Sequence, residues 1–519
     1  MGFATHDLHQ AIPAFTFNGK MESIGDQHEE KFNPMPDLTH TPDWVKNAVF
    51  YQILPDRFAK SESLEKPGHL EPWDAPPTRF GFKGGDLLGV IEKLDYLQDL
   101  GITAIYFNPI FTSAANHRYH TYDYYHVDPL LGGNTTFFKL LDAAHQRDIR
   151  IVLDGVFNHA SRGFFQFNHI LENGAASPYL DWFRVYGFPL NAYQGKPNYS
   201  CWWNLPALPQ FNTDNPRVCA FLFEVAKHWI EQGIDGWRLD VPFEIKDESF
   251  WRQFRTATKL PDKDAYLVGE IPSEAQDWLQ GDMFDGVMNY QFTAACIGFF
   301  GAECRDETMI SGMMGLPEVP VLDAAGFAKR TKVLLEIYPR QNALAQLNLM
   351  GSHDTARFLT MASGNTNALR LATLFQMTYP GAPCIYYGDE IGLMGGRDPL
   401  NRGTFPWDES RWDHDLRKAV RTYIHLRREH RALRTGEYVP IHAEGRHLAY
   451  LRFLEKERML IALNAGESNW ELNLPLDERL PEGMLLKDLL GGADARVEGA
   501  CLRGRTLLPW EGAVFAPIE

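Results

Sequence analysis

The sequence predicts an α/β fold: a (β/α)8 TIM barrel with a subdomain inserted after strand 3 and an antiparallel β domain at the C-terminal end. Eight short apolar runs alternate with amphipathic helical stretches over residues 48–390, which is typical of a parallel sheet buried on both faces. A connection of 56 residues, rich in aromatic, Asn, Gly and Pro residues, follows the third run and is too long for a structureless loop. After about residue 435 the pattern changes to short alternating stretches, as expected for antiparallel strands.

The expected barrel strands are short and rich in β-branched and aromatic residues. The clearest helices between them are 88–101, which stops at Gly101, then 135–148, and 216–233, which begins with Pro and ends with Gly. The eight expected strands are residues 48–54, 102–110, 149–159, 234–240, 265–270, 284–289, 347–354 and 384–390.

These patterns divide the chain into four parts. Residues 1–42 form an N-terminal extension, 43–159 and 214–432 the barrel, 160–213 the inserted subdomain, and 433–519 the C-terminal β domain.

Composition limits the kinds of partner that suit the chain. It has 50 Lys and Arg residues against 67 Asp and Glu residues, a net charge of −17, which is unfavourable for binding nucleic acid or an anionic membrane. No apolar run reaches membrane-spanning length, and the N-terminus does not resemble a signal peptide. Six scattered cysteines without a CxxC motif are typical of free thiols in a reducing compartment. We therefore expect a cytoplasmic protein.

One expected strand carries two charges on the same face. In "GIDGWRLDVP" (233–242), Arg238 and Asp240 lie two residues apart, so both side chains point to one side of an apolar element. Burying charge is costly unless the charge is paired or used, and this pair therefore calls for a function.

Several other strands also end in polar residues, and in a TIM barrel the active site lies at these carboxyl ends. A single strand-end Asp is more often a cap or an ion pair, but three carboxylates with an Arg and two His favour a catalytic site. Two carboxylates that face one bond are what glycoside cleavage needs. The strand-end residues are Asp154, Asn158, His159, Arg238, Asp240, Glu270, His353 and Asp354.

These residues fall within four short motifs: "DGVFNH" (154–159), "GWRLD" (236–240), "VGE" (268–270) and "GSHD" (351–354). In this order they resemble the motifs of the α-amylase family, glycoside hydrolase family thirteen. Residues 80–111, and "LPQFNT" (208–213), are similar to its neopullulanase, cyclomaltodextrinase and maltogenic amylase group. The resemblance covers residues 43–410, whereas the C-terminal domain matches the architecture of the family more than its sequence.

The resemblance implies a role for each carboxylate. Asp240 would be the nucleophile that forms a covalent glycosyl-enzyme, Glu270 the general acid and then base, and Asp354 a ligand of sugar hydroxyls. Arg238 would hold Asp240 ionised by lowering its pKa, while Glu270 would keep its proton in a less solvated site near negative charge.

The remaining residues of the predicted site would bind substrate. His159 and His353 would donate hydrogen bonds to sugar hydroxyls, beside Asp154 and Asn158. In "RYHTYDYY" (118–125), His120 and Tyr122 would provide a histidine and a stacking aromatic, with ordinary loop packing as the alternative.

Two further features leave alternatives open. Glu244 would shape the acceptor side, or would simply be a solvated glutamate. Trp202 and Trp203 are interpreted as core of the inserted subdomain, with a place in the substrate cleft as the alternative.

The chain departs from the family pattern in three places. Only about 42 residues precede the barrel, so a homo-oligomer would not form through the usual N-terminal β domain. The usual calcium loop is not recognisable after "PDRF", where Ser61, Glu62 and Ser63 would be weak ligands. We therefore expect no required cofactor or metal, with a bound calcium ion as the alternative. Pro272 replaces a tryptophan beside Glu270.

The predicted function is retaining hydrolysis of α-glucosidic bonds, mainly α-1,4 and also α-1,6, in short linear, cyclic or branched maltooligosaccharides. A transglycosylase of the same fold is the first alternative, because both share double displacement. A non-catalytic sugar-binding relative would typically lack one of the three carboxylates. A metal- or phosphate-dependent barrel is disfavoured because the sequence has no HExxH and no P-loop.

Overall fold

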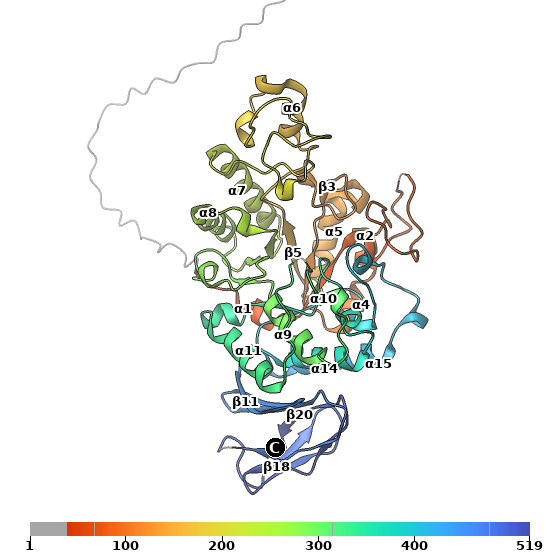
Figure 1. Ribbon diagram of the computed structural model, residues 1–519, viewed down its shortest axis with the longest axis vertical. Coiled ribbons are helices and arrows are strands. Elements are labelled where there is room, and N and C mark those ends of the chain that lie inside the picture. The colour runs from red at the N-terminus through yellow and green to blue at the C-terminus, as the bar shows by residue number, and fades with distance from the viewer. Residues whose placement is uncertain (1–38, 67, 314, 477, 519) are drawn as a thin grey trace, which may run out of the picture. The chain divides into compact units, whose positions relative to one another are not determined.

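The computed structural model describes residues 39–66, 68–313, 315–476 and 478–518 (Figure 1). Most of the predicted N-terminal extension, residues 1–38, lies outside the described residues.

The predicted TIM barrel is confirmed. Eight strands form one sheet in the order β8-β7-β6-β5-β2-β1-β10-β9, with parallel pairing throughout, and a parallel bridge between Met288 and Leu347 connects its two ends. All eight predicted strands are therefore present. They are β1 (Phe50–Ile53), β2 (Ala104–Phe107), β5 (Arg150–Gly155), β6 (Gly236–Leu239), β7 (Tyr266–Gly269), β8 (Gly286–Val287), β9 (Leu347–Leu349) and β10 (Ala382–Tyr386).

The strand register brings the polar strand ends to one level. Asp154 of β5 pairs with Arg238 of β6, and Leu239 pairs with Gly269 of β7. Asp240 and Glu270, which follow directly, therefore emerge side by side at the carboxyl end of the barrel.

Helices connect the strands and bury their apolar faces against the sheet. Asn215 caps α7 by accepting a hydrogen bond from the Arg217 N–H, and Gly101 ends α4 with a left-handed backbone (φ 98°). The predicted helix 88–101 is two helices that meet at Lys93. The helices of the barrel region are α1 (Asp43–Asn47), α2 (Pro55–Phe58), α3 (Leu87–Glu92), α4 (Leu94–Leu100), α5 (Gly133–His145), α7 (Pro216–Glu231), α8 (Glu248–Lys259), α9 (Tyr290–Phe300), α10 (Glu307–Ile310), α11 (Ala324–Glu336), α12 (Arg340–Ala343), α13 (Phe358–Met361), α14 (Thr366–Thr378), α15 (His414–Glu429) and α16 (Arg431–Thr435).

The segment 160–213, which we keep as the proposed inserted subdomain, has one helix, α6 (Phe165–Asn173), and short 3-10 turns (Figure 1). Isolated bridges join Phe183 to Phe211 and His159 to Gln210, so the segment folds back onto the end of β5. A hairpin of β3 (Phe111–Ser113) and β4 (Thr121–Val127), which the sequence did not predict, precedes α5.

The predicted C-terminal β domain is also confirmed. Its main sheet is antiparallel, in the order β11-β12-β13-β20-β16-β17-β18-β15, and β14 pairs with β19 beside it. The strands are β11 (Glu437–Glu444), β12 (His447–Leu454), β13 (Glu457–Asn464), β14 (Trp470–Glu471), β15 (Leu474–Pro475), β16 (Leu485–Asp488), β17 (Ala495–Glu498), β18 (Cys501–Arg503), β19 (Thr506–Leu507) and β20 (Gly512–Pro517).

Two of the sequence expectations concern the whole chain. All six cysteines are free thiols. Among the helices that the structure describes, none has the length and apolarity needed to cross a bilayer.

Candidate active site

Arg238 is the centre of a carboxylate cluster at the carboxyl end of the barrel. Its side chain is fully buried, and its Nη1 lies 2.8 Å from Asp154 Oδ1 and 3.0 Å from Asp240 Oδ1. Its Nη2 lies 2.8 Å from Glu270 Oε2. One guanidinium group therefore contacts three carboxylates from three neighbouring strands, which explains why a charged pair is tolerated in an apolar strand.

Backbone hydrogen bonds fix the positions of Asp240 and Glu270. The N–H of Asp240 donates to the carbonyl of Gly155, and the N–H of Glu270 donates to the carbonyl of Leu239, both at 3.0 Å. Val241 follows Asp240 in a left-handed conformation, φ 36° and ψ 52°, and its N–H donates to Glu270 Oε2 at 3.1 Å. Such a backbone costs about 1–3 kcal/mol for a β-branched residue, and it aims a donor at the second carboxylate.

Asp354 has its own set of cationic and polar neighbours. Its Oδ2 lies 3.1 Å from His353 Nε2, and its Oδ1 lies 3.3 Å from Arg402 Nη2. Arg402 also donates through Nε to the carbonyl of His353 at 2.8 Å. Sequence reasoning missed Arg402, because it lies in a 3-10 turn, Leu400–Arg402, beyond the end of the last barrel strand.

The environment of Glu270 suits a group that holds a proton. Burial raises its pKa to about 7, against the lowering effect of Arg238 and with a further rise from the negative charge of Asp354. This agrees with the expected requirement for a general acid.

The electrostatics of Asp240 differ from our expectation. Burial raises its pKa well above the ordinary value of 3.8, and this effect exceeds the lowering by Arg238, while Glu270 raises the pKa further. Arg238 does lower the pKa of Asp240, as expected, but burial and the negative charges of Glu270, Asp154 and Asp354 together raise this pKa by more. The pKa of Asp354 is lowered, because the interactions with His353, Arg402 and Arg238 and the hydrogen bond from Glu270 together outweigh its burial.

His353 lies beside Asp354 at the cluster, His159 follows the end of β5, and both histidines are neutral. Burial lowers the pKa of both His159 and His353 to about 3. Gln52 donates through Nε2 to His353 Nδ1 at 2.9 Å, and Asn158 donates through Nδ2 to His159 Nδ1 at 3.1 Å. His159 Nε2 is buried, and no described residue forms a hydrogen bond of ordinary geometry with it.

The structure brings Tyr119, rather than Tyr122, to the cluster. Its hydroxyl donates to Asp154 Oδ2 at 2.7 Å and lies 2.7 Å from His353 Nε2, and its ring stacks on His353 with centroids 5.4 Å apart. The Tyr122 ring instead covers Gly163, where a Cβ would come within 2.3 Å of it.

The error in register has a simple origin in the sequence. His117-x-Tyr119 and His120-x-Tyr122 are two identical His-x-Tyr patterns three residues apart. Only Tyr119, in the first pattern, contacts a carboxylate of the cluster. Tyr122, in the second, belongs to β4, which begins at Thr121. His117 Nδ1 also accepts from the backbone N–H of Tyr119 at 3.2 Å.

Two other candidate positions are now located. Glu244 is half-buried in the 3-10 turn Pro242–Glu244, and its acceptor-side role remains a prediction. Trp203 is 60% exposed, so the interpretation of Trp202 and Trp203 as subdomain core is wrong for the second of the pair.

The residues at the expected calcium loop do not fit a calcium ion. Ser61 donates through Oγ to Glu92, and Glu62 is exposed beside Lys60. The ammonium group of Lys66 donates to the Asp86 carboxylate and the Gly84 carbonyl, the kinds of oxygen that calcium would require. Throughout the described part of the chain, no three His, Cys, Asp or Glu residues are arranged to hold a metal ion.

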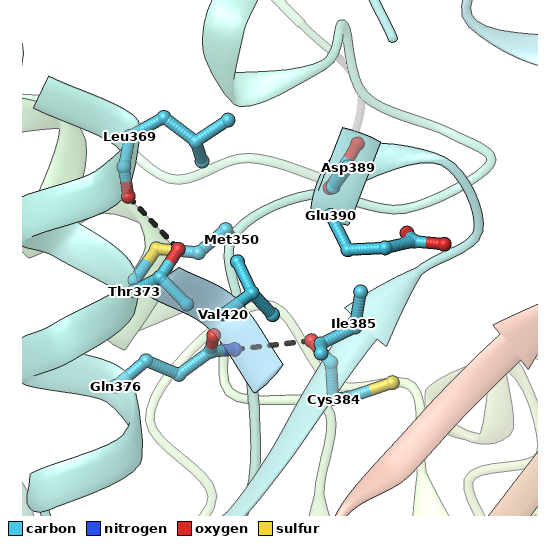
Figure 2. Close-up of a pocket in the computed structure, with 9 residues that line it drawn as sticks. All are labelled: Met350, Leu369, Thr373, Gln376, Cys384, Ile385, Asp389, Glu390 and Val420. Carbon is cyan, nitrogen blue, oxygen red and sulfur yellow. Dashed lines mark hydrogen bonds between the residues drawn. The ribbon is translucent and has the colours of Figure 1, made fainter. Parts of the chain in front are cut away.

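A small cavity close to β10 also contains carboxylates but is not a second site (Figure 2). Its volume is about 10 Å³, room for about one water molecule and far too little for a sugar. Asp389 pairs with Arg357 at 2.7 Å, and Glu390 accepts from the hydroxyls of Tyr51 and Tyr96 at 2.7 Å. These carboxylates are satisfied by structural partners.

Comparison with known proteins identifies both parts of the chain. The model of the alpha-amylase catalytic domain matches residues 52–436, and the model of the neopullulanase-like C-terminal domain matches residues 438–516. A cyclomaltodextrinase from a Bacillus species is 45% identical over 444 residues, which is 85% of this chain and 76% of that protein. Neopullulanase 2 of Thermoactinomyces vulgaris is 42% identical over 480 residues, 92% of this chain and 78% of that protein. The solved structure of the Nostoc punctiforme debranching enzyme is 47% identical, with a TM-score of 0.84 over 92% of this chain and 99% of that one.

Proposed function

The chain belongs to the α-amylase family of glycoside hydrolases, which cleave α-glucosidic bonds, and we propose that Asp240, Glu270 and Asp354 carry out this reaction here. The observation that carries the proposal is the contact of one buried guanidinium, Arg238, with both Asp240 and Glu270. Retaining glycosidases need two carboxyl groups about 5–5.5 Å apart, and two groups that share one guanidinium are compatible with that separation.

Asp240 is the nucleophile in this proposal. Its carboxylate attacks the anomeric carbon, and the bond to the leaving oxygen breaks as Glu270 donates its proton to that oxygen. Glu270 then removes a proton from water, which attacks the glycosyl-enzyme and releases Asp240. The productive form has Glu270 protonated and Asp240 ionised.

Asp354 and the neutral histidines hold the sugar. Asp354 is ionised in the pH range where Glu270 is protonated, because its pKa is lowered and that of Glu270 is raised. A carboxylate that accepts bonds from sugar hydroxyls also stabilises the positive charge that develops on the ring. His159 supports the proposal with its unpartnered buried Nε2, which suits a hydroxyl.

The substrate is a short linear, cyclic or branched maltooligosaccharide. The names of the relatives, cyclomaltodextrinase and neopullulanase, support short α-1,4-linked substrates, and the debranching enzyme supports action on α-1,6 bonds as well. Pro272, two residues after Glu270, would leave the acceptor side wider than a tryptophan at this position would.

Calcium is not required for this activity in our proposal. The support is Lys66, whose ammonium group already neutralises the fully buried Asp86. We also propose that the enzyme acts in the cytoplasm, in keeping with six free thiols, and that it binds neither nucleic acid nor membrane, in keeping with its net charge of −17.

A time course on the purified protein tests the proposal. β-Cyclodextrin, maltotriose, pullulan and soluble starch are offered side by side, with and without a chelator, and the products are separated by chromatography. We expect rapid opening of the cyclodextrin and little attack on starch. Products longer than the starting sugar would identify a transglycosylase, and no action on any of the four would contradict the proposed substrate class.

A further inference from the structure

The inserted subdomain presents one tryptophan to solvent on a strained backbone. Trp203 is 60% exposed, and its backbone has φ 51° and ψ 27°, while Asn204 follows with φ 56°. The left-handed region costs a non-glycine residue about 1–2 kcal/mol, and asparagine tolerates it better than tryptophan. A large exposed ring therefore occupies a position where glycine would be more stable.

The strained turn is firmly tied to the end of β5. Cys201 and Pro209 form a bridge across it, and the Trp202 N–H donates to the Leu208 carbonyl at 3.0 Å. The next residues connect it to the active site, because the Ala160 N–H donates to the Pro209 carbonyl at 3.0 Å and His159 bridges to Gln210. The turn is thus held in a fixed position relative to His159.

Three rings form a row that begins at His159, four residues after the end of β5. The His159 ring stacks on Trp202 with centroids 5.5 Å apart and planes 21° apart, and Trp202 stacks on Trp203 at 5.0 Å and 5°. His159 is buried, Trp202 is half-buried and Trp203 is exposed, so the row runs outward from the site. One face of the last indole is packed, and much of the remainder of the ring is open.

We propose that Trp203 is a stacking platform for a glucose unit of the glucan, at least one unit away from the bond that is cleaved. The apolar C–H face of a pyranose lies flat on an indole, and the burial of both surfaces favours the contact. The occupant is the glucan itself, because the platform is continuous with the site that holds the same chain at His159. This inference rests on the proposed function and adds a contact that only longer substrates reach.

The test compares substrates of two lengths. In Trp203→Gly, the ratio of kcat/KM for maltoheptaose to that for maltotriose should fall about fivefold to tenfold. Glycine relieves the left-handed strain, so this variant should fold with a melting temperature at least equal to that of the wild type. Trp203→Phe keeps a flat ring and should retain most of the ratio. A structural role of Trp203 would instead lower the melting temperature in Trp203→Gly and affect both substrates alike.

The matched control is Phe165→Ala, which removes another ring of the same subdomain that is 63% exposed but outside the row. In this variant the ratio of kcat/KM for maltoheptaose to that for maltotriose should equal the wild-type ratio. Calorimetric titration of Glu270→Gln with maltoheptaose provides a readout without turnover, and adding Trp203→Gly should weaken binding by the same factor. An unchanged ratio in Trp203→Gly, in an enzyme that cleaves both sugars, would overturn the inference. Cleavage of neither sugar by the wild type would overturn the proposed function and this inference with it.

Discussion

Val241 donates its backbone N–H to the Glu270 carboxylate at 3.1 Å, and it does so from a left-handed conformation that a β-branched residue rarely adopts. The residue after the proposed nucleophile thus orients the proposed general acid. The backbone strain at Val241 thus lies between Asp240 and Glu270, and the reaction depends on the relative position of these two carboxyl groups.

Replacing Val241 with glycine should therefore cost little stability. Losing a buried valine side chain costs about 1.5–3 kcal/mol, and relief of the backbone strain returns about 1–3 kcal/mol. The free energy of unfolding should fall by no more than about 2 kcal/mol, as measured by urea denaturation. Val152→Gly in β5, where the buried valine is in an extended strand, is the control and should cost about 3 kcal/mol or more. Equal losses in both variants would show that Val241 is not strained.

The raised pKa of Glu270, about 7, predicts the alkaline limit of activity. Below this pH the group holds the proton that the leaving oxygen needs. As the pH rises through 7 the proton is lost, and kcat/KM should fall about tenfold per unit. An activated aryl maltoside, whose leaving group needs no proton, should show a much weaker decline above pH 7. The same steep decline with both substrates would assign the limit to another group.

Asp240→Asn should abolish turnover without harming the fold. The variant lacks the nucleophile, so kcat should fall at least about a thousandfold. Because burial opposes the charge on Asp240, removing that charge should leave the melting temperature equal or higher. Activity and calorimetric melting measured on one preparation separate these effects. Near-normal turnover would contradict the mechanism, and a large loss of stability would contradict the electrostatic account.

The corrected position of the aromatic side chain can be tested by removing single hydroxyl groups. Tyr119→Phe loses contacts with Asp154 and His353, and we expect kcat/KM on maltotriose to fall about tenfold to a hundredfold. Tyr122→Phe is the matched control and should stay within about twofold of the wild type. The reverse ranking would restore the register predicted from the sequence.

Lys66 should make the stability of the wild type independent of calcium. Neither a chelator nor added calcium should move its melting temperature. Lys66→Ala leaves the Asp86 carboxylate buried without its cation and should cost about 3–5 kcal/mol. Lys60→Ala, which removes a largely exposed lysine of the same loop, should have little effect. A wild-type melting temperature that falls on chelation would show that a metal ion is bound after all.

The strand-end residues could be predicted from the sequence because barrel geometry leaves little freedom. Parallel strands in register put Asp154, Arg238 and the residue after Gly269 at one end, whatever the loops do. Regularly alternating strands and helices, with charged residues at the end of each apolar run, are enough to locate these strand-end residues.

The residues that sequence analysis missed lie in loops and turns, where no regular sequence pattern shows which side chains reach the active site. Arg402 reaches Asp354 from a turn 48 residues later in the chain, and nothing in its local sequence indicates this contact. Tyr119 was hidden by a repeated His-x-Tyr pattern that only the start of β4 resolves. The pKa of Asp240 depends on its burial and on the neighbouring carboxylates that oppose the effect of Arg238, and both are properties of the folded site alone.

The cation that pairs with Asp86 is the ammonium group of Lys66, which is covalently part of the chain. A dissociable ion occupies its site in proportion to its free concentration, so the loop that depends on it weakens whenever the supply falls. A tethered ammonium group is always present at the same local concentration, which dilution and competing ligands do not change. We therefore expect the connection between α2 and α3 to keep its structure when the concentration of free metal ions changes.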